Sequence, residues 1–237
     1  MSLNHKLSLS SDSEHTAFVI QARMRSTRLP GKVLSEFCGK PMLKFQIDLL
    51  RKNNLGIDII VATSTNEENG KIEELCVDNN IQCIRENENN VIQRFYRSAQ
   101  LFSLKHIIRL TGDNPLPNLN LIRFCLNKHL RDLPDLTSTR QILRDRSIMR
   151  YVPKGLSVDI LNCKTLLSLD YTLLTNFERE HVIPVFFRDG YTVNIVSDYK
   201  TSLPELSVDT MEDFKRVSSY AQNLLHHGQL LNTLGYN

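Results

Sequence analysis

The chain has 237 residues, of which 41% are hydrophobic and 23% charged, a composition typical of a globular protein that buries a full core. Its formal net charge is +3, and because residues 23–32 alone contribute +4, the rest of the chain sums to −1. This local basicity favours a small anionic ligand and argues against a nucleic-acid partner.

The cysteines give no sign of a disulfide framework or a zinc site, because their number is odd and no two have the close spacing that zinc ligands need. We expect reduced core thiols in a cytoplasmic protein. No apolar run approaches the length of a membrane span, and the first sixteen residues lack the apolar core of a signal peptide, so no membrane partner is expected. The cysteines are Cys38, Cys76, Cys83, Cys125 and Cys163.

We expect a single domain, because no internal repeat, low-complexity linker or change in composition divides the chain. Residues 1–15 are polar and serine-rich, without helical or strand periodicity, and we interpret them as a disordered extension. The domain then covers residues 16–226. Residues 227–237 are interpreted as a polar tail.

The first half of the chain alternates between short apolar runs and amphipathic stretches. This alternation predicts βαβ units, and hence an α/β fold with a mostly parallel sheet and helices on both faces. The strands are expected at residues 17–22, 57–63, 82–84 and 106–110, with helices that open at Pro41 and at Glu67 and a third from 90 to 102.

The second half is expected to open with an amphipathic helix at residues 119–130. Shorter β-like runs between residues 136 and 160 predict a small antiparallel addition to the sheet. Helices are expected at 161–174 and 176–187, strands at 191–196 and 206–208, and a final helix at 210–225 whose Thr210 and Asp213 resemble a capping box.

The most informative stretch is the first strand and the basic loop that follows it. Ligands of open α/β sheets bind beyond the carboxyl ends of the strands, so this loop is a candidate phosphate site. Arginine suits bidentate contact with phosphate oxygens, and Gly31 allows a close approach of the backbone. The loop is not a P-loop, because Ser26 replaces its first glycine and Val33 follows the lysine. A solvated basic turn is the alternative interpretation.

Five motifs follow one another along the chain, at residues 20–34, 109–116, 153–159, 178–182 and 208–213. In this order they resemble those of the sugar cytidylyltransferases, the CMP-sugar synthetases that activate ketodeoxyoctonate and acylneuraminates. The branch that they resemble most is the one labelled spore coat polysaccharide biosynthesis protein F. The resemblance covers about residues 17–220 and implies a Rossmann-like nucleotide-diphospho-sugar transferase fold, CTP and a sugar acid as substrates, Mg²⁺ as cofactor and a homodimer.

The resemblance also implies roles for single residues. Arg28, Lys32, Asp113 and Asp209 match the catalytic positions, and the two aspartates match the magnesium ligands. Arg25 falls at a variable position. The nucleotide-binding residues implied are Gln21, Ala22, Arg23, Arg28, Gly31, Lys32 and Arg94.

The residues themselves leave alternatives open. Asp113 lies in Gly-Asp-Asn-Pro, which is also a good turn sequence, and Asp209 stands where it could cap the final helix. Asp159 is the alternative second metal ligand, or it contacts the sugar. Mg²⁺ prefers one or two carboxylates together with phosphate oxygens, which either pair would supply.

The resemblance places the sugar near Lys154, Gly155, Asp159, Arg179 and His181. His181 could act as a general base because imidazole titrates near neutrality, but on a helix it is as easily structural. A solvated lysine in a turn is the alternative for Lys154.

Other functions compete with a cytidylyltransferase. Glycosyltransferases that use nucleotide sugars share this kind of sheet, but they commonly bind their metal through Asp-x-Asp, and no two aspartates of this chain lie two apart. A non-catalytic nucleotide-binding regulator is the other alternative, which an intact set of basic loop and aspartates disfavours.

Overall fold

The computed structural model describes residues 15–236. The extension expected at residues 1–15 therefore lies, except for His15, outside the described residues. Within the described chain, no helix is both long enough and apolar enough to cross a lipid bilayer.

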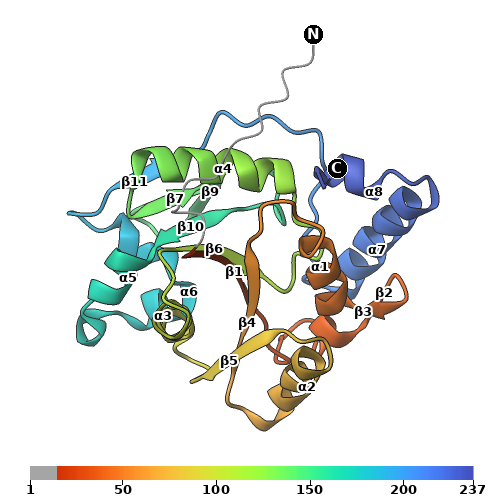
Figure 1. Cartoon of the computed structure of the whole chain (residues 1–237), viewed down its shortest axis with the longest axis horizontal. Helices are drawn as coiled ribbons and strands as arrows, with labels where there is room; N and C mark the ends of the chain where they lie inside the picture. Colours follow the sequence, from red (N-terminus) through yellow and green to blue (C-terminus); the bar gives the residue numbers. More distant parts are fainter. Residues whose placement is uncertain (1–14, 237) are drawn as a thin grey trace.

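Within residues 15–236, seven strands form one twisted sheet in the order β11-β7-β10-β6-β1-β4-β5 (Figure 1). Strands β6, β1, β4 and β5 are mutually parallel, and β11 is parallel to β7. Strand β10 runs antiparallel to both of its neighbours, β6 and β7. The expected α/β fold with an antiparallel addition is confirmed. The strands are β1 (Thr16–Gln21), β4 (Asp58–Ser64), β5 (Gln82–Glu86), β6 (His106–Thr111), β7 (Leu136–Ser138), β10 (Asp159–Asn162) and β11 (Val193–Ile195).

Strand β1 is central because its residues are apolar on both faces. Phe18 and Ile20 face one core cluster, and Ala17 and Val19 face the other. A continuous apolar run of this kind suits a parallel strand that is covered on both sides. Residues that follow β1 and β6 therefore emerge side by side at the same edge of the sheet.

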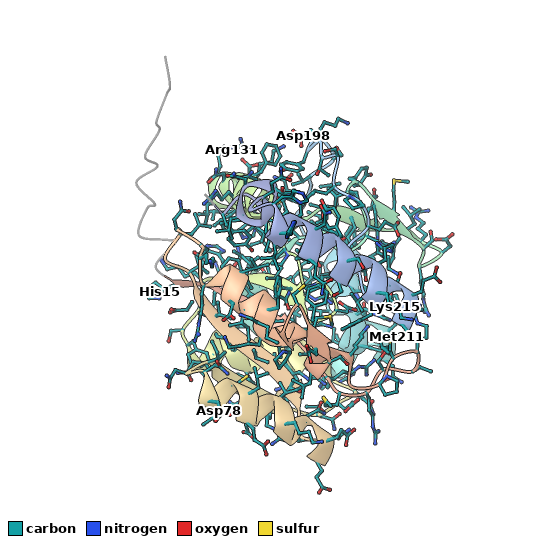
Figure 2. All side chains as sticks on the ribbon, turned by 90° about the vertical axis from the view of Figure 1, so that its right-hand side faces the viewer. His15, Asp78, Arg131, Asp198, Met211 and Lys215 are labelled. Carbon is teal, nitrogen blue, oxygen red and sulfur yellow. The ribbon has the colours of Figure 1, made fainter. Side chains whose placement is uncertain are left out.

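Helices cover both faces of the sheet. The core around Phe18 and Ile20 is closed by α1 (Met42–Leu50), α4 (Leu119–Asp132), α7 (Met211–His226) and α8 (Leu230–Leu234). Figure 2 shows α7, with Met211 and Lys215 labelled, running across this side of the molecule beside α1. The opposite core is closed by α3 (Val91–Leu101), α5 (Cys163–Ser168), α6 (Asn176–His181) and the 3-10 helix η5 (Ile183–Phe187).

The remaining elements are short. Helix α2 (Gly70–Asp78) follows the 3-10 turn η3 (Glu67–Asn69) and lies below β4 and β5 in Figure 1. Two-stranded ribbons are formed by β2 (Glu36–Phe37) with β3 (Lys40–Pro41), and by β8 (Arg140–Ile142) with β9 (Ile148–Arg150). The 3-10 turns η2 (Lys32–Leu34) and η4 (Tyr171–Leu173) complete the described chain.

The helix expected at residues 161–174 is shorter than predicted. Leu161 belongs to β10, and α5 begins only after Asn162, whose side chain caps it by accepting a hydrogen bond from the Lys164 amide. The strand expected at 206–208 is wrong for the described chain. The amides of Leu206 and Val208 donate instead to the loop carbonyls of Lys154 and Asp113, so this segment bridges two loops and joins no sheet.

The C-terminal residues also differ from a polar tail. Helix α8 buries Leu230 and Leu234 against the core, and the buried Tyr236 hydroxyl donates to the Pro117 carbonyl at 3.1 Å. Leu230 and Leu234 lie on one face of α8 because they are four residues apart, so this short helix packs against the core near the beginning of α4.

Candidate active site

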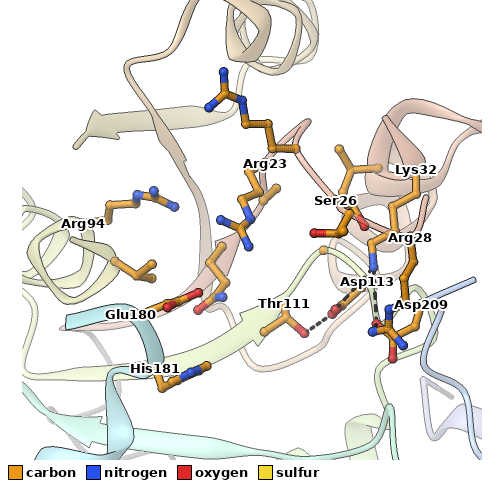
Figure 3. Close-up of a pocket in the computed structure, with 17 residues that line it drawn as sticks. Arg23, Ser26, Arg28, Lys32, Arg94, Thr111, Asp113, Glu180, His181 and Asp209 are labelled. Atoms are coloured by element: carbon orange, nitrogen blue, oxygen red, sulfur yellow. Dashed lines mark hydrogen bonds and ion pairs between the residues drawn. The ribbon is translucent and has the colours of Figure 1, made fainter. Parts of the chain in front are cut away.

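A pocket of about 280 Å³ opens beyond the carboxyl ends of β1 and β6, where the basic loop leaves the sheet. We call it the loop pocket. Figure 3 shows Arg28, Lys32, Asp113 and Asp209 gathered at one end and Arg94, Glu180 and His181 at the other. Parallel strands present their carboxyl ends to the same crevice, which is why residues 21–32 and 111–113 meet.

The basic loop is held in shape by its own backbone and by η3. The Gly31 amide donates to the Met24 carbonyl at 2.8 Å, and Gly31 has a φ of 71°, the left-handed conformation that glycine adopts without strain. The Asn69 side chain accepts from the Met24 amide at 2.7 Å. These contacts within the protein hold the loop in its shape.

The cations of the loop are already paired with acids. Arg23 lies 3.5 Å from Glu88, and Arg25 lies 2.7 Å from Glu68. Arg28 lies 3.0 Å from Oδ1 of Asp209. An anionic ligand that binds these cations must replace the acids that now pair with them. Such replacement costs little, because an exposed ion pair contributes little to the stability of the fold.

Lys32 lies between the two aspartates. Its ammonium is 3.7 Å from Asp113 Oδ2 and 3.6 Å from Asp209 Oδ1, and it donates to the Val208 carbonyl at 2.6 Å. Asp209 also accepts from Lys154 at 2.5 Å. Burial favours the neutral acid, but the Lys154 hydrogen bond and the charges of Lys32 and Arg28 outweigh it and lower the pKa of Asp209. Both aspartates therefore lie within 4 Å of the same ammonium group.

These carboxylates fit a cation that takes few protein ligands. Across residues 15–236, no group of three or more His, Cys, Asp or Glu side chains is arranged to hold a metal. Asp113 and Asp209 line the pocket with carboxylate oxygens that could serve as ligands, and Mg²⁺ typically completes such a set with phosphate oxygens and water. The donor set therefore suits a cation that binds together with a nucleotide.

Arg94 forms the opposite wall of the pocket and is almost wholly buried. It donates to the carbonyls of Asn87 and Glu88, at 3.3 and 2.8 Å. Burial lowers the pKa of Arg94 to about 10, so the side chain stays charged at neutral pH. Its Nε has no hydrogen-bond partner among the described residues, although buried donors usually have one.

A second pocket, of about 160 Å³, adjoins the first and shares Thr111, Asp113 and Asp209 with it. We call it the side pocket. Arg109 enters from β6, and the β8–β9 ribbon supplies Arg140 and Arg150, which are paired across its strands. The wall is strongly cationic. Lys154, Gly155, Ser157 and Ser207 complete it with Asn114.

The family profile of cytidylyltransferases matches residues 17–226, nearly the whole described chain and both pockets. The chain belongs to the cytidylyltransferase family. It is a nucleotidyltransferase, and the match begins at the strand that leads into the basic loop.

Two proteins are similar to this cytidylyltransferase in sequence over most of their length. An uncharacterized protein of Methanocaldococcus jannaschii is 31% identical over 83% of this chain and 79% of its own length. The spore coat polysaccharide biosynthesis protein SpsF of Bacillus subtilis is 27% identical over 86% of this chain and 85% of its own.

Solved structures agree with this fold. A cytidylyltransferase from Leptospira borgpetersenii superimposes with a TM-score of 0.78 at 25% identity, covering 88% of this chain and 87% of its own. A CMP:2-keto-3-deoxy-manno-octonic acid synthetase in complex with CTP gives a TM-score of 0.67 at 17% identity, covering 88% and 98%. The second similarity concerns the fold alone.

Most of the predicted site residues of the cytidylyltransferase line one of the two pockets. The loop pocket contains the predicted nucleotide-binding residues except Gly31, which shapes the loop behind it, and it also contains His181. The imidazole of His181 packs on the Phe177 ring, with centroids 4.5 Å apart. Desolvation lowers the pKa of His181, and the arginines of the side pocket add to this effect.

Asp159 and Arg179, predicted to bind the sugar, line neither pocket. Asp159 is buried behind the side pocket, where it binds Arg109 and Arg140 at 2.9 and 2.5 Å. Burial opposes its charge, but these arginines lower the pKa of Asp159, so the carboxylate stays ionised and orients both. Arg179 donates to the carbonyls of Tyr171 and Leu174, a structural role.

Gly155 has a steric reason to be glycine. Its φ is +96°, and a β-carbon would lie 2.2 Å from the Ser207 amide nitrogen. This contact brings residues 153–156 against 206–209 and so sets Lys154 beside Asp209.

Sequence reasoning missed the cations of the side pocket and the buried Gln46. Arg109 stands in the motif at residues 109–116, in which the resemblance gives a role to Asp113 alone, and Arg140 and Arg150 lie in the stretch that predicts only short β-like runs. The signal for Gln46 is a polar residue on the apolar face of α1, three residues after Leu43.

Proposed function

We propose that this enzyme transfers CMP from CTP to a hydroxyl group of a sugar acid, of the acylneuraminate or ketodeoxyoctonate kind, and releases pyrophosphate. The enzyme would act in the cytoplasm as a homodimer, and its product would be used for the synthesis of a surface polysaccharide. Support comes from the family, from a relative named for spore coat polysaccharide synthesis and from a structural neighbour solved with CTP.

The observation that carries the proposal is the junction of the two pockets. Asp209 binds Arg28 in the loop pocket through one oxygen and Lys154 in the side pocket through the other. A transfer between two substrates needs adjacent sites that hold their reacting atoms close together. The loop pocket suits the triphosphate, and the side pocket suits the acceptor.

The chemistry follows from charge and position. The acceptor hydroxyl oxygen forms a bond to the α-phosphorus of CTP and releases its proton to water. The bond from this phosphorus to the oxygen that bridges it to the β-phosphorus breaks, so that pyrophosphate leaves with the electron pair. Negative charge grows on the leaving group, and Arg28 and Lys32, which lie together at one end of the loop pocket, would neutralise it. Arg23 adds a further cation to the same loop.

Asp113 and Asp209 would hold Mg²⁺, which supplies charge neutralisation on the triphosphate when it is bound. The Lys32 ammonium, within 4 Å of both carboxylates, keeps them together beforehand. Without such a cation, two adjacent carboxylates repel each other.

The acceptor should be anionic, because the side pocket carries more positive than negative charge. Asp159 is shared between Arg109 and Arg140, and Arg150 adds a further positive charge. Arg140 is held in place by two hydrogen bonds, from its Nε and Nη2 to Asp159, and the remaining N–H groups of its guanidinium would face the carboxylate of a sugar acid.

The test is incubation with each of the four common nucleoside triphosphates and a panel of sugar acids, with Mg²⁺ and pyrophosphate detection. We expect pyrophosphate release with CTP and an acidic sugar, and a CMP-sugar resonance by phosphorus NMR. Turnover of a nucleotide sugar without any use of free CTP would instead indicate a glycosyltransferase. Light scattering of the same sample tests the homodimer.

A further inference from the structure

Helix α1 carries a buried amide on a face that otherwise packs into the core. Gln46 is fully buried, as are its neighbours Leu43, Ile47 and Leu50. Transfer of an amide from water into such surroundings is unfavourable unless hydrogen bonds replace those to water. A specific partner must therefore account for a glutamine at this position.

The partners of Gln46 are the carbonyls on either side of Asp113. Its Nε2 donates to Thr111 O at 3.2 Å and to Asn114 O at 3.0 Å. Because both partners are acceptors, the amide nitrogen must face them. Its Oε1 then has no partner among the described residues, which leaves a buried acceptor unsatisfied. An apolar side chain would avoid this cost, so packing alone does not explain the residue.

The loop that contains Asp113 is tied to other parts of the chain as well. The Gly112 amide donates to Gln21 O at the end of β1, and the Val208 amide donates to Asp113 O, both at 2.9 Å. A β-carbon on Gly112 would lie 3.1 Å from Cβ of Ala22, so the loop also lies tightly against the basic loop. The backbone groups of residues 111–114 are thus anchored to segments remote in sequence.

This anchoring sets the direction of the carboxylate. Thr111 Oγ1 donates to Asp113 Oδ1 at 2.5 Å, and Asn114 Nδ2 donates to Thr111 Oγ1 at 2.8 Å. The remaining oxygen, Oδ2, is the one that faces Lys32 and the loop pocket. If the backbone of Thr111 or Asn114 moved, the side chains that hold Asp113 would move as well, and the Asp113 carboxylate would change its direction.

We propose that Gln46 is a positioning residue, whose buried amide holds the Thr111–Asn114 turn so that the Asp113 carboxylate faces the loop pocket. The proposal deepens the function given above and rests on it for the role of Asp113. Gln46 touches no substrate, and it acts through the two carbonyls that it binds. Small errors in the position of a catalytic group are costly, so a fixed turn matters for rate more than for stability.

The experiment compares Gln46→Met, which keeps the length of the side chain but loses the donor, with Ile47→Val as a matched core variant. For Gln46→Met we expect faster amide hydrogen exchange at residues 111–116 and a raised Mg²⁺ concentration for half-maximal rate. We also expect kcat to fall by about 10- to 100-fold with little change in KM for CTP. Ile47→Val should lower the melting temperature and leave these properties unchanged.

A second variant, Gln46→Glu, tests the donor itself. The protonated carboxyl can donate to a carbonyl, whereas the carboxylate cannot, and burial raises the pKa of such an acid. The rate of this variant relative to the unsubstituted enzyme should therefore rise as the pH is lowered from about 9.5 to about 6, a range that spans the raised pKa of a buried glutamic acid. This variant also decides the matter if Gln46→Met does not fold.

The proposal is overturned if Gln46→Met matches Ile47→Val in exchange, metal requirement and kcat, or if the relative rate of Gln46→Glu does not change with pH. The exchange measurement needs no substrate. If the unsubstituted enzyme does not use CTP at all, the proposed function fails, and the exchange of residues 111–116 still decides whether Gln46 holds the turn.

Discussion

Lys154 and Asp209 form an ion pair, with the ammonium 2.5 Å from Oδ2, that joins the side pocket to the loop pocket. The other oxygen of Asp209 faces Arg28 and Lys32. One carboxylate therefore organises cations that come from two separate parts of the chain, the basic loop and the segment around Lys154, and both substrates of a transfer reaction would meet beside it.

Asp209→Asn should abolish most of the activity without unfolding the protein. The amide keeps the shape of the side chain but removes the charge that balances Arg28, Lys32 and Lys154. We expect kcat to fall by about 100-fold or more and the Mg²⁺ requirement to rise. Steady-state kinetics at several Mg²⁺ concentrations measure both effects.

Asp213→Ala is the control for this variant, because Asp213 closes the capping box with Thr210 at the start of α7. It should cost about 1 kcal/mol of stability and leave kcat within a few-fold. If Asp209→Asn keeps full activity and only lowers the melting temperature, Asp209 has a structural role alone.

Arg28→Ala should weaken CTP binding by about 10-fold or more and leave the melting temperature nearly unchanged. The Arg28 side chain is 60% exposed, and its pair with Asp209 is the kind of contact that contributes little to folding. Lys32 differs, because it is only 10% exposed and donates to the Val208 carbonyl. Lys32→Ala should therefore lower both affinity and melting temperature.

Calorimetry with CTP and thermal unfolding test these expectations together. Arg25→Ala, which breaks an exposed pair with Glu68, provides the comparison within the same loop. An Arg28→Ala variant that binds CTP as tightly as the unsubstituted protein would exclude Arg28 from triphosphate recognition.

Gly155→Ala should be much more damaging than Gly190→Ala. Both glycines have a φ near +95°, so alanine is strained at either position by about 1–2 kcal/mol. Only at Gly155 would the new β-carbon also collide with the backbone of Leu206 and Ser207, whereas at Gly190 it meets no described atom within 4 Å. Chemical denaturation of the two variants isolates the clash, and equal losses of stability would contradict this packing.

Acidification should destabilise the protein before its carboxylates titrate. Burial, with the charge of neighbouring His106 adding to it, lowers the pKa of His129 to about 3, against about 6.5 for a free histidine. Below about pH 6.5 the unfolded chain binds a proton that the folded chain does not, so stability falls as the pH falls from 6.5 toward 3. Between pH 7 and pH 5 we expect a loss of about 2 kcal/mol in the free energy of unfolding.

Urea unfolding at the two pH values measures this loss, and His129→Leu should make it smaller. The lowered pKa of Asp159 contributes outside this window, because its stabilisation is lost only below about pH 4. An unchanged free energy of unfolding between pH 7 and pH 5 would show that His129 is protonated within the fold.

The sequence alone determined those features that arise from local patterns. Continuous apolar runs predicted the buried strands β1, β4 and β6, and apolar residues three and four apart predicted α1, α3, α4 and α7. The position of Arg28, Lys32 and Asp113 after two of these strands followed from the rule that parallel strands end at one edge. These inferences needed no knowledge of which segments pack together.

Only the tertiary structure decided how segments remote in sequence meet. Leu206 and Val208 alternate like a strand, but their amides bond to the loops of Lys154 and Asp113, which no local pattern reveals. Asp159 looks like a free acid at a strand end until Arg109 and Arg140 are seen to enclose it. Gln46 acquires a role only when α1 packs beneath Thr111 and Asn114. In each case the partner is at least nineteen residues away in the sequence, so the interaction depends on packing that propensity and periodicity do not encode.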